Sequence, residues 1–194
     1  MWHSKSKLLD IHRRFPSRLK IRVSIDHYAS DMHEEIRGLR SWRPVIEGLL
    51  WLAENGFDIA IAGRNIRNET DKTIRSGYQR LFESLGVSIN AADPAQLVIF
   101  PEMDGRVDVP EITEQCWRIL NKQPDTVMCA SSRMVIKRKG AERPAVISCT
   151  LLPYESAFEL GTTLAESCGS VKLNHPHCAK FCVLGGASCS PRIN

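Results

Sequence analysis

Cysteine is the residue type whose spacing in this chain most clearly predicts chemistry. Three cysteines near the C-terminus follow the pattern Cys178-x3-Cys182-x6-Cys189, and Cys129 and Cys149 flank a segment that is typical of a β-hairpin. Thiolates are soft ligands that suit iron–sulfur clusters or zinc, and a four-iron cluster needs four of them. We therefore predict that these five cysteines include the ligands of a metal site.

The remaining cysteines do not suggest a disulfide framework. The chain has 7 cysteines, an odd number, and its first residues do not form a secretory signal, which favours a reducing compartment. Cys116 lies on the apolar face of a predicted helix and is expected to be a small core residue. The residues around Cys168 do not indicate a role for it.

Zinc is the alternative to an iron–sulfur cluster. Cys178, Cys182 and Cys189 could complete a four-ligand zinc site with His175 or His177. A metal of either kind would also hold the C-terminal stretch, because that stretch has too few apolar residues to fold by itself.

The first two-thirds of the sequence alternates apolar strands with amphipathic helices. We expect strands over 19–25, 57–62 and 97–100, with a charged loop over 29–40. Helices are predicted near 8–15, from a cap at Ser41 to Asn55, around 74–85 and over 110–120, the last with Ile112, Cys116 and Ile119 inward. Such alternation predicts an α/β fold with a parallel sheet covered by helices.

Polar residues follow each of these strands. Asp26 and His27 end the first, Arg64 and Asn65 follow the second, and Glu102 and Asp104 follow the third. The carboxyl edge of a parallel sheet is where α/β proteins bind ligands. Three strands cannot close a barrel, so we expect a partner or a larger protein to complete the sheet.

The pattern changes near residue 127. Two β-type runs, 134–139 and 145–151, predict a hairpin, and a short helix is expected within 153–167. We therefore predict two domains, a partial (β/α) barrel with parallel strands over 1–126 and a small extension of hairpin and Cys-rich loop over 127–194.

Composition excludes several classes of protein. Of the 194 residues, 43% are hydrophobic and 25% are charged, which is typical of a globular protein and excludes a mostly disordered one. No apolar run approaches the roughly 20 residues of a membrane span, so we expect a cytoplasmic protein without membrane contact. The basic residues of the first 22 positions are interpreted as a solvated helix face, and no nucleic-acid partner is expected.

Several of these segments together resemble the radical SAM superfamily. RVSIDHY, HEEIRG and AENGFDIAIAGRN are similar to the second half of its barrel, where a strand ending in Ser-x-Asp precedes a charged loop and the next βα unit. MCASSRMVIKRKG, AVISCTLLP and HCAKFCVLGGASC resemble the auxiliary-cluster extensions of SPASM or twitch type, in which cysteines flank a hairpin. The spacing from Gly140 to Cys149 is longer than is usual in those extensions.

The resemblance implies a function with one element missing. The family's catalytic cluster is held by a C-x3-C-x2-C triad, which this sequence lacks, so the chain is not expected to be catalytic alone. Its tail would hold an auxiliary 4Fe-4S cluster. Ser24, Asp26 and Arg64 would contact S-adenosylmethionine if the full barrel were present. The implied partner is a separate or missing N-terminal half of the barrel, and the substrate, a small molecule or a peptide, is not indicated.

Two other functions compete with this one. The first is a structural zinc-binding or interaction module without catalysis. The second is a self-contained α/β enzyme that uses Asp26, His27 and Glu102 as acid–base groups, although no nucleophile elbow, phosphate loop or dinucleotide motif accompanies them.

Overall fold

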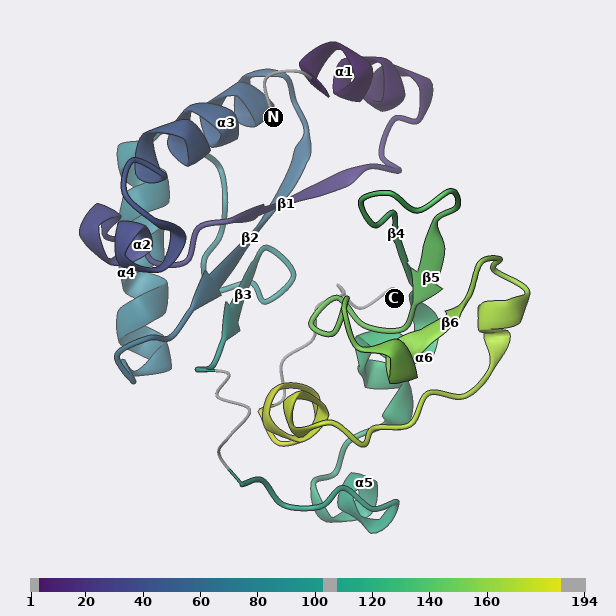
Figure 1. Cartoon of the computed structure of the whole chain (residues 1–194). Coiled ribbons are helices and arrows are strands. Elements are labelled where there is room, and N and C mark those ends of the chain that lie inside the picture. The colour runs from purple at the N-terminus through teal and green to yellow at the C-terminus, as the bar shows by residue number, and fades with distance from the viewer. Residues whose placement is uncertain (1–3, 103–107, 186–194) are drawn as a thin grey trace. The chain divides into compact units, whose positions relative to one another are not determined.

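The computed structural model describes residues 4–102 and 108–185, which form parts of two compact units, Met1–Glu102 and Met103–Asn194 (Figure 1). The predicted division of roles after residue 126 stays a prediction. Each unit has its own sheet, so each is described by itself.

The first unit is built on a parallel sheet of three strands, β1 (Lys20–Ser24), β2 (Asp58–Arg64) and β3 (Leu97–Phe100), in the order β1-β2-β3. Its helices are α1 (Lys5–Arg14), α2 (Ser30–Arg37), α3 (Trp42–Glu54) and α4 (Asp71–Ser84). The predicted α/β class and parallel sheet are therefore confirmed. The sheet is not closed into a barrel within the described residues.

One face of this sheet carries the core. Leu49 and Leu52 of α3, with Ile74 of α4, are fully buried in the same cluster as Ile61 and Leu97 of the sheet. Figure 1 shows α3 and α4 on the same side of the strands. Burying this apolar face against amphipathic helices is the main stabilising contribution to such a layered fold.

The strand positions between those core residues have a different composition. Alternate residues of a strand point to opposite faces, so β1 and β2 present Arg22, Ser24, Ala60, Ala62 and Arg64 on the face away from Ile61. On β1 and β2 this second face is therefore rich in small and basic residues, whereas the first is aliphatic. On β3 it carries Val98 and Phe100, in register with Ala62 and Arg64.

Two local predictions for the first unit were wrong. The segment expected to be a loop over 29–40 contains α2, a helix whose charged residues surround the single buried side chain of His33. Ser41 precedes α3 but makes no side-chain capping hydrogen bond, and the cap that does form on α4 is Thr70, whose hydroxyl accepts from the Thr73 amide.

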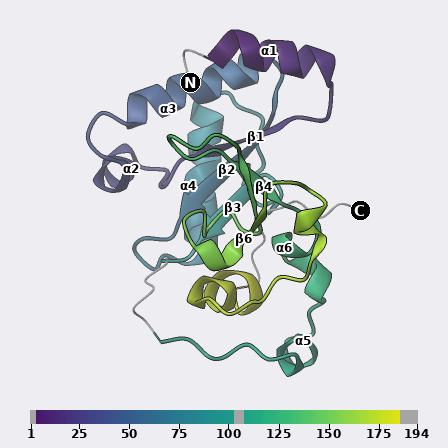
Figure 2. The ribbon, with the colours of Figure 1, turned by 45° about the vertical axis from the view of Figure 1, so that its right-hand side comes forward.

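The second unit contains an antiparallel sheet, seen beside α6 in Figure 2. The strands β4 (Met134–Ile136), β5 (Ala145–Ile147) and β6 (Glu159–Gly161) pair in the order β4-β5-β6, which confirms the predicted hairpin. Its helical segments are α5 (Gln115–Ile119), η2 (Pro124–Thr126), α6 (Met128–Ser131), η3 (Ser156–Phe158), η4 (Glu166–Cys168) and η5 (Cys178–Val183).

Two helix predictions for the second unit hold only in part. The short helix expected within 153–167 is reduced to the 3-10 helix η3, and β6 follows it because Phe158 and Ser148 continue the antiparallel pairing through main-chain hydrogen bonding. The helix expected over 110–120 is limited to α5, and Ile119, expected inward, is 72% exposed. No helix among the described residues has the length and apolar character needed to cross a membrane.

Candidate metal centre and sheet-edge site

Four of the five predicted metal-binding cysteines line one small pocket in the second unit. The thiol-bearing residues are Cys129, Cys149, Cys178 and Cys182. The rest of the wall is apolar except for one imidazole, and it consists of Met128, Leu151, Phe158, Val171, Leu173 and His177. The structure thus brings together, at one place, residues up to 53 positions apart in the sequence.

Three short segments position these thiols. Cys129 lies in α6, and Cys149 follows the end of β5 by two residues. Cys178 and Cys182 both belong to η5, a π-helix in which the amide of Leu184 donates to the carbonyl of Ala179. Residues four apart lie on the same side of so wide a turn, and π-helical turns occur often at functional sites.

Burial controls the protonation of two of these thiols. The pKa of Cys178 is raised, mainly by burial and further by the neighbouring Cys149 and Cys129. Burial also raises the pKa of Cys149, although its sulfur accepts a hydrogen bond from the Leu151 amide at 3.4 Å. Both groups are therefore thiols at neutral pH, and a metal that binds them as thiolates must release protons.

A histidine pair borders the same pocket. The amide of His177 donates to Nδ1 of His175 at 3.1 Å, and their rings lie 4.6 Å apart. Nδ1 of His177 is buried and has no hydrogen-bond partner in the part of the chain that the structure describes. Burial, and then His175 and Lys180, lower the pKa of His177, which keeps its imidazole neutral.

The other cysteines lie outside this group. Cys189 falls beyond the described residues, so its place in a ligand set stays a prediction. Cys116 is half-buried on α5, where its sulfur accepts from the Thr113 amide, and Cys168 is exposed. No disulfide joins any of the six described cysteines, and no three His, Cys, Asp or Glu side chains within 4–102 and 108–185 are already grouped for a single metal ion.

The three predicted cofactor-binding residues of the first unit lie at the carboxyl edge of the sheet. Ser24 is exposed at the end of β1. The Asp26 carboxylate is only 3% exposed and is held by two guanidinium groups, those of Arg37 and of Arg64, the latter at 3.1 Å. Arg37 and Arg64 are 42% and 54% exposed, so the arginines, rather than the carboxylate, face solvent.

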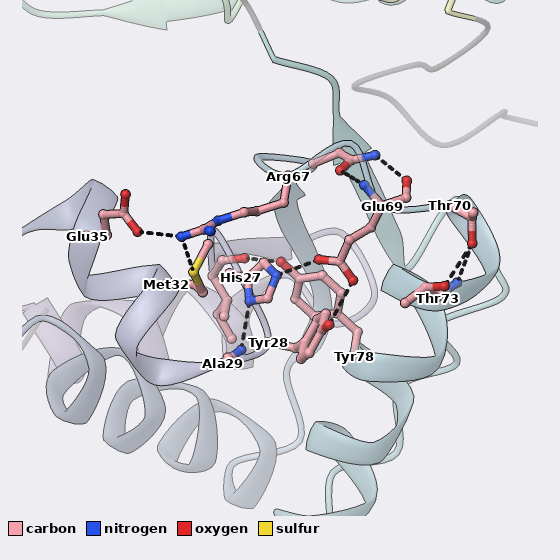
Figure 3. A network of polar contacts seen from close by, with 12 residues as sticks. His27, Tyr28, Ala29, Met32, Glu35, Arg67, Glu69, Thr70, Thr73 and Tyr78 are labelled. Carbon is pink, nitrogen blue, oxygen red and sulfur yellow. Dashed lines mark hydrogen bonds and ion pairs between the residues drawn. The ribbon is translucent and has the colours of Figure 1, made fainter.

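Next to Asp26 and its two arginines, a second polar network joins the end of β1 to the segment before α4 (Figure 3). Glu69 accepts from Nε2 of His27 at 2.9 Å and from the Tyr28 hydroxyl at 2.8 Å. Nδ1 of His27 accepts from the Ala29 amide, so both ring nitrogens are engaged. Figure 3 also shows Arg67 reaching Glu35. The side-chain partner of His27 is thus Glu69.

Two glycines allow tyrosines to pack under this edge. A Cβ at Gly63 would lie 2.3 Å from the Tyr78 hydroxyl, and one at Gly77 would lie 2.5 Å from the ring of Tyr28. Tyr78 is fully buried, and its hydroxyl donates to the Ile25 carbonyl at 2.7 Å. Because Gly63 and Gly77 have no side chain, β1, β2 and α4 can approach one another closely.

Arg37 and Glu69 are the residues of this edge that the sequence did not reveal. Arg37 comes from a segment expected to be a loop, and Glu69 pairs with a histidine 42 positions away. Arg37 lies within the segment HEEIRG, which carried part of the resemblance but was given no site role, and Glu69 belongs to no motif.

Comparison with known proteins gives no assignment. No family model matches the chain, and neither a curated protein nor a solved structure is significantly similar to it.

Proposed function

We propose that this chain binds a 4Fe-4S cluster in its second unit and is an iron–sulfur protein of the radical SAM type. The observation that supports the proposal most is the convergence of Cys129, Cys149, Cys178 and Cys182 on one pocket. Four thiolates are the number that such a cluster takes, and they come here from separate short segments.

The walls of the pocket suit a cluster as well. Apolar side chains such as Phe158 and Leu173 would exclude water from it. The Leu151 amide, which donates to the sulfur of Cys149, is the kind of donor that tunes the potential of a cluster. A cluster bound by four cysteines leaves no iron open to a substrate, so its role would be the transfer of one electron at a time.

The first unit fits the same proposal as part of a (β/α) barrel. Its strands follow one another in order, its helices cover one face, and the small and basic residues lie on the other. Ser24 and Arg64 would approach S-adenosylmethionine, while Asp26 would hold Arg64 and Arg37 in place. Binding of this cofactor and catalysis would both require the separate or missing N-terminal half of the barrel.

Metal analysis of the intact chain tests the cluster. After anaerobic incubation with iron and sulfide, we expect about four iron and four sulfide per chain. Cys178→Ala and Cys182→Ala should each lose most of the iron. The matched controls are Cys168→Ala, at an exposed thiol, and Cys116→Ala on α5, and both should retain it. Equal iron in all four variants would contradict the proposed ligands.

A structural zinc site is the second candidate, and one observation favours it. The buried Nδ1 of His177 lacks a hydrogen-bond partner among the described residues and belongs to the same pocket wall as Cys178 and Cys182. A neutral imidazole is a good zinc ligand at about 2.0–2.1 Å. Colourless protein with one zinc per chain, lost in His177→Ala, would establish this alternative and exclude the cluster.

A further inference from the structure

Arg133 links Cys129, a residue of the cysteine pocket, to the segment 167–169 through hydrogen bonds to main-chain carbonyls. Its Nη1 donates to the carbonyl of Cys129 at 2.7 Å and to that of Ser132 at 2.9 Å. Its Nε donates to the Ser167 carbonyl at 2.8 Å, and its Nη2 lies 3.3 Å from the Gly169 carbonyl. One planar group therefore joins the end of α6 to η4 and the residues after it.

The charge of Arg133 is the second notable feature. All four partners that the structure describes for it are neutral carbonyls, so no carboxylate among them offsets its positive charge. One of these carbonyls belongs to Cys129 itself. Arg138, two residues after the end of β4, provides the contrast, because it forms an ion pair with Glu159 at 2.7 Å.

A second cation lies at another wall of the pocket. Lys122 donates to the carbonyl of Val183, the last residue of η5, which carries Cys178 and Cys182. Cations at the C-terminal ends of helices satisfy carbonyls that have no partner within the helix. Each of the two helices that carry pocket cysteines thus has a cationic side chain bonded to one of its carbonyls.

From these contacts we infer that Arg133 is a positioning residue for the cluster and raises its reduction potential; this inference rests on the proposed function. The fork of donors fixes Cys129 relative to the segment leading to Val171 and Leu173, two apolar residues of the wall. A cluster bound by four thiolates gains one negative charge when it accepts one electron, and a nearby fixed cation stabilises that state.

The experiment compares Arg133→Gln, Arg133→Lys and Arg138→Gln in the full chain after anaerobic reconstitution. Midpoint potentials are measured by redox titration with mediators and a chemical reductant, and cluster loss is followed during incubation with an iron chelator. Arg133→Gln should raise the ratio of oxidised to reduced cluster at a fixed potential on the order of tenfold, equivalent to about 59 mV for one electron. Arg138→Gln removes the same charge from a residue that bonds Glu159 and the Pro153 carbonyl and not the main chain of a pocket cysteine, so it should change this ratio much less.

Arg133→Lys separates charge from geometry. The ammonium keeps the charge but cannot form the planar fork, so the potential should stay near that of the wild type while the chelator removes iron several-fold faster. If Arg133→Gln takes up no cluster but melts without metal like the wild type, while Arg138→Gln loads normally, the positioning role is supported.

Two results would overturn the inference. The first is an Arg133→Gln cluster whose potential and chelation rate both match those of Arg138→Gln. The second is a wild-type chain that binds no iron, which would remove the proposed function itself and is recognised before any variant is compared.

Discussion

The two units differ in whether their buried polar side chains are paired with other side chains. At the edge of the parallel sheet, each buried polar group meets another side chain: Asp26 is held by two arginines, and Glu69 by His27 and Tyr28. In the second unit, Cys149 and Cys178 face an apolar pocket, and burial raises the pKa of both thiols. The first arrangement is complete within the protein, whereas the second is suited to an added group.

This difference follows from what each unit can bury. The first unit has a continuous core of aliphatic and aromatic side chains between one sheet face and its helices. Among the described residues, the second has three-residue strands and buries fewer apolar side chains than the first, among them Ile147, Phe158 and Phe181. A small core supplies little net stability, and bound metal is a common way to supplement it.

Metal removal should therefore give the largest difference between the two units. Chelation should lower the free energy of unfolding of the second unit by several kcal/mol and leave the first unit's transition unchanged. The metal-free second unit should weaken further above about pH 8.5, because the thiols of Cys149 and Cys178 stay protonated when folded but ionise in the unfolded chain.

Calorimetry with and without a chelator, repeated from pH 7 to 9.5, measures both effects. Cys168→Ala serves as the control, since it removes an exposed thiol without touching the pocket. If a chelator shifts both unfolding transitions equally, the two units do not differ in their dependence on metal.

A smaller effect should separate the buried ion pair of the first unit from an exposed one. Arg37→Gln leaves the Asp26 carboxylate, 3% exposed, with Arg64 as its remaining charged partner, and should cost about 2 kcal/mol of stability. Arg67→Gln breaks an exposed pair with Glu35 and should change stability by less than about 0.5 kcal/mol. Urea unfolding of both variants gives the comparison, and equal losses would show that Asp26 does not depend on Arg37.

The smallest expected effect concerns Glu69. Hydrogen bonding from His27, supported by Tyr28, lowers the pKa of Glu69 when folded. Its contribution is therefore present above about pH 4.3, the unfolded value, and is lost as the pH falls through the folded pKa. Glu69→Gln should lower the free energy of unfolding by about 1–2 kcal/mol at pH 7. The difference in this free energy between the variant and the wild type should disappear in acid.

Urea unfolding at pH 7 and pH 3 checks this closure. Glu83→Gln, at an exposed site on α4, should be nearly neutral at both pH values. A gap of constant size across this range would mean that the charge of Glu69 is not what stabilises the network.

The sequence predicted the parts of the fold that depend on local pattern. The strand 97–100 was predicted with its observed bounds, and the helices beginning after Ser41 and near Ile74 were predicted from their apolar spacing. The helix α2 was missed because it has one buried side chain, so its charged residues were interpreted as a loop. The strand β6 was missed because it is short and forms only by pairing with β5.

The same limit applies to the candidate sites. Spacing alone identified Cys178 with Cys182, and the hairpin identified Cys129 with Cys149, but only the folded chain shows all four around one pocket. The hydrogen bond of His27 to Glu69 and the ion pair of Asp26 with Arg37 depend on helix positions that a linear pattern does not specify.

The location of η5 has a consequence for the order of assembly. During synthesis, Cys129 and Cys149 leave the ribosome before Cys178 and Cys182, which follow them in the sequence. The pocket cannot be complete until those residues have been made. If a cofactor binds there, its insertion must follow the synthesis of η5, and binding would close the loops between the cysteines.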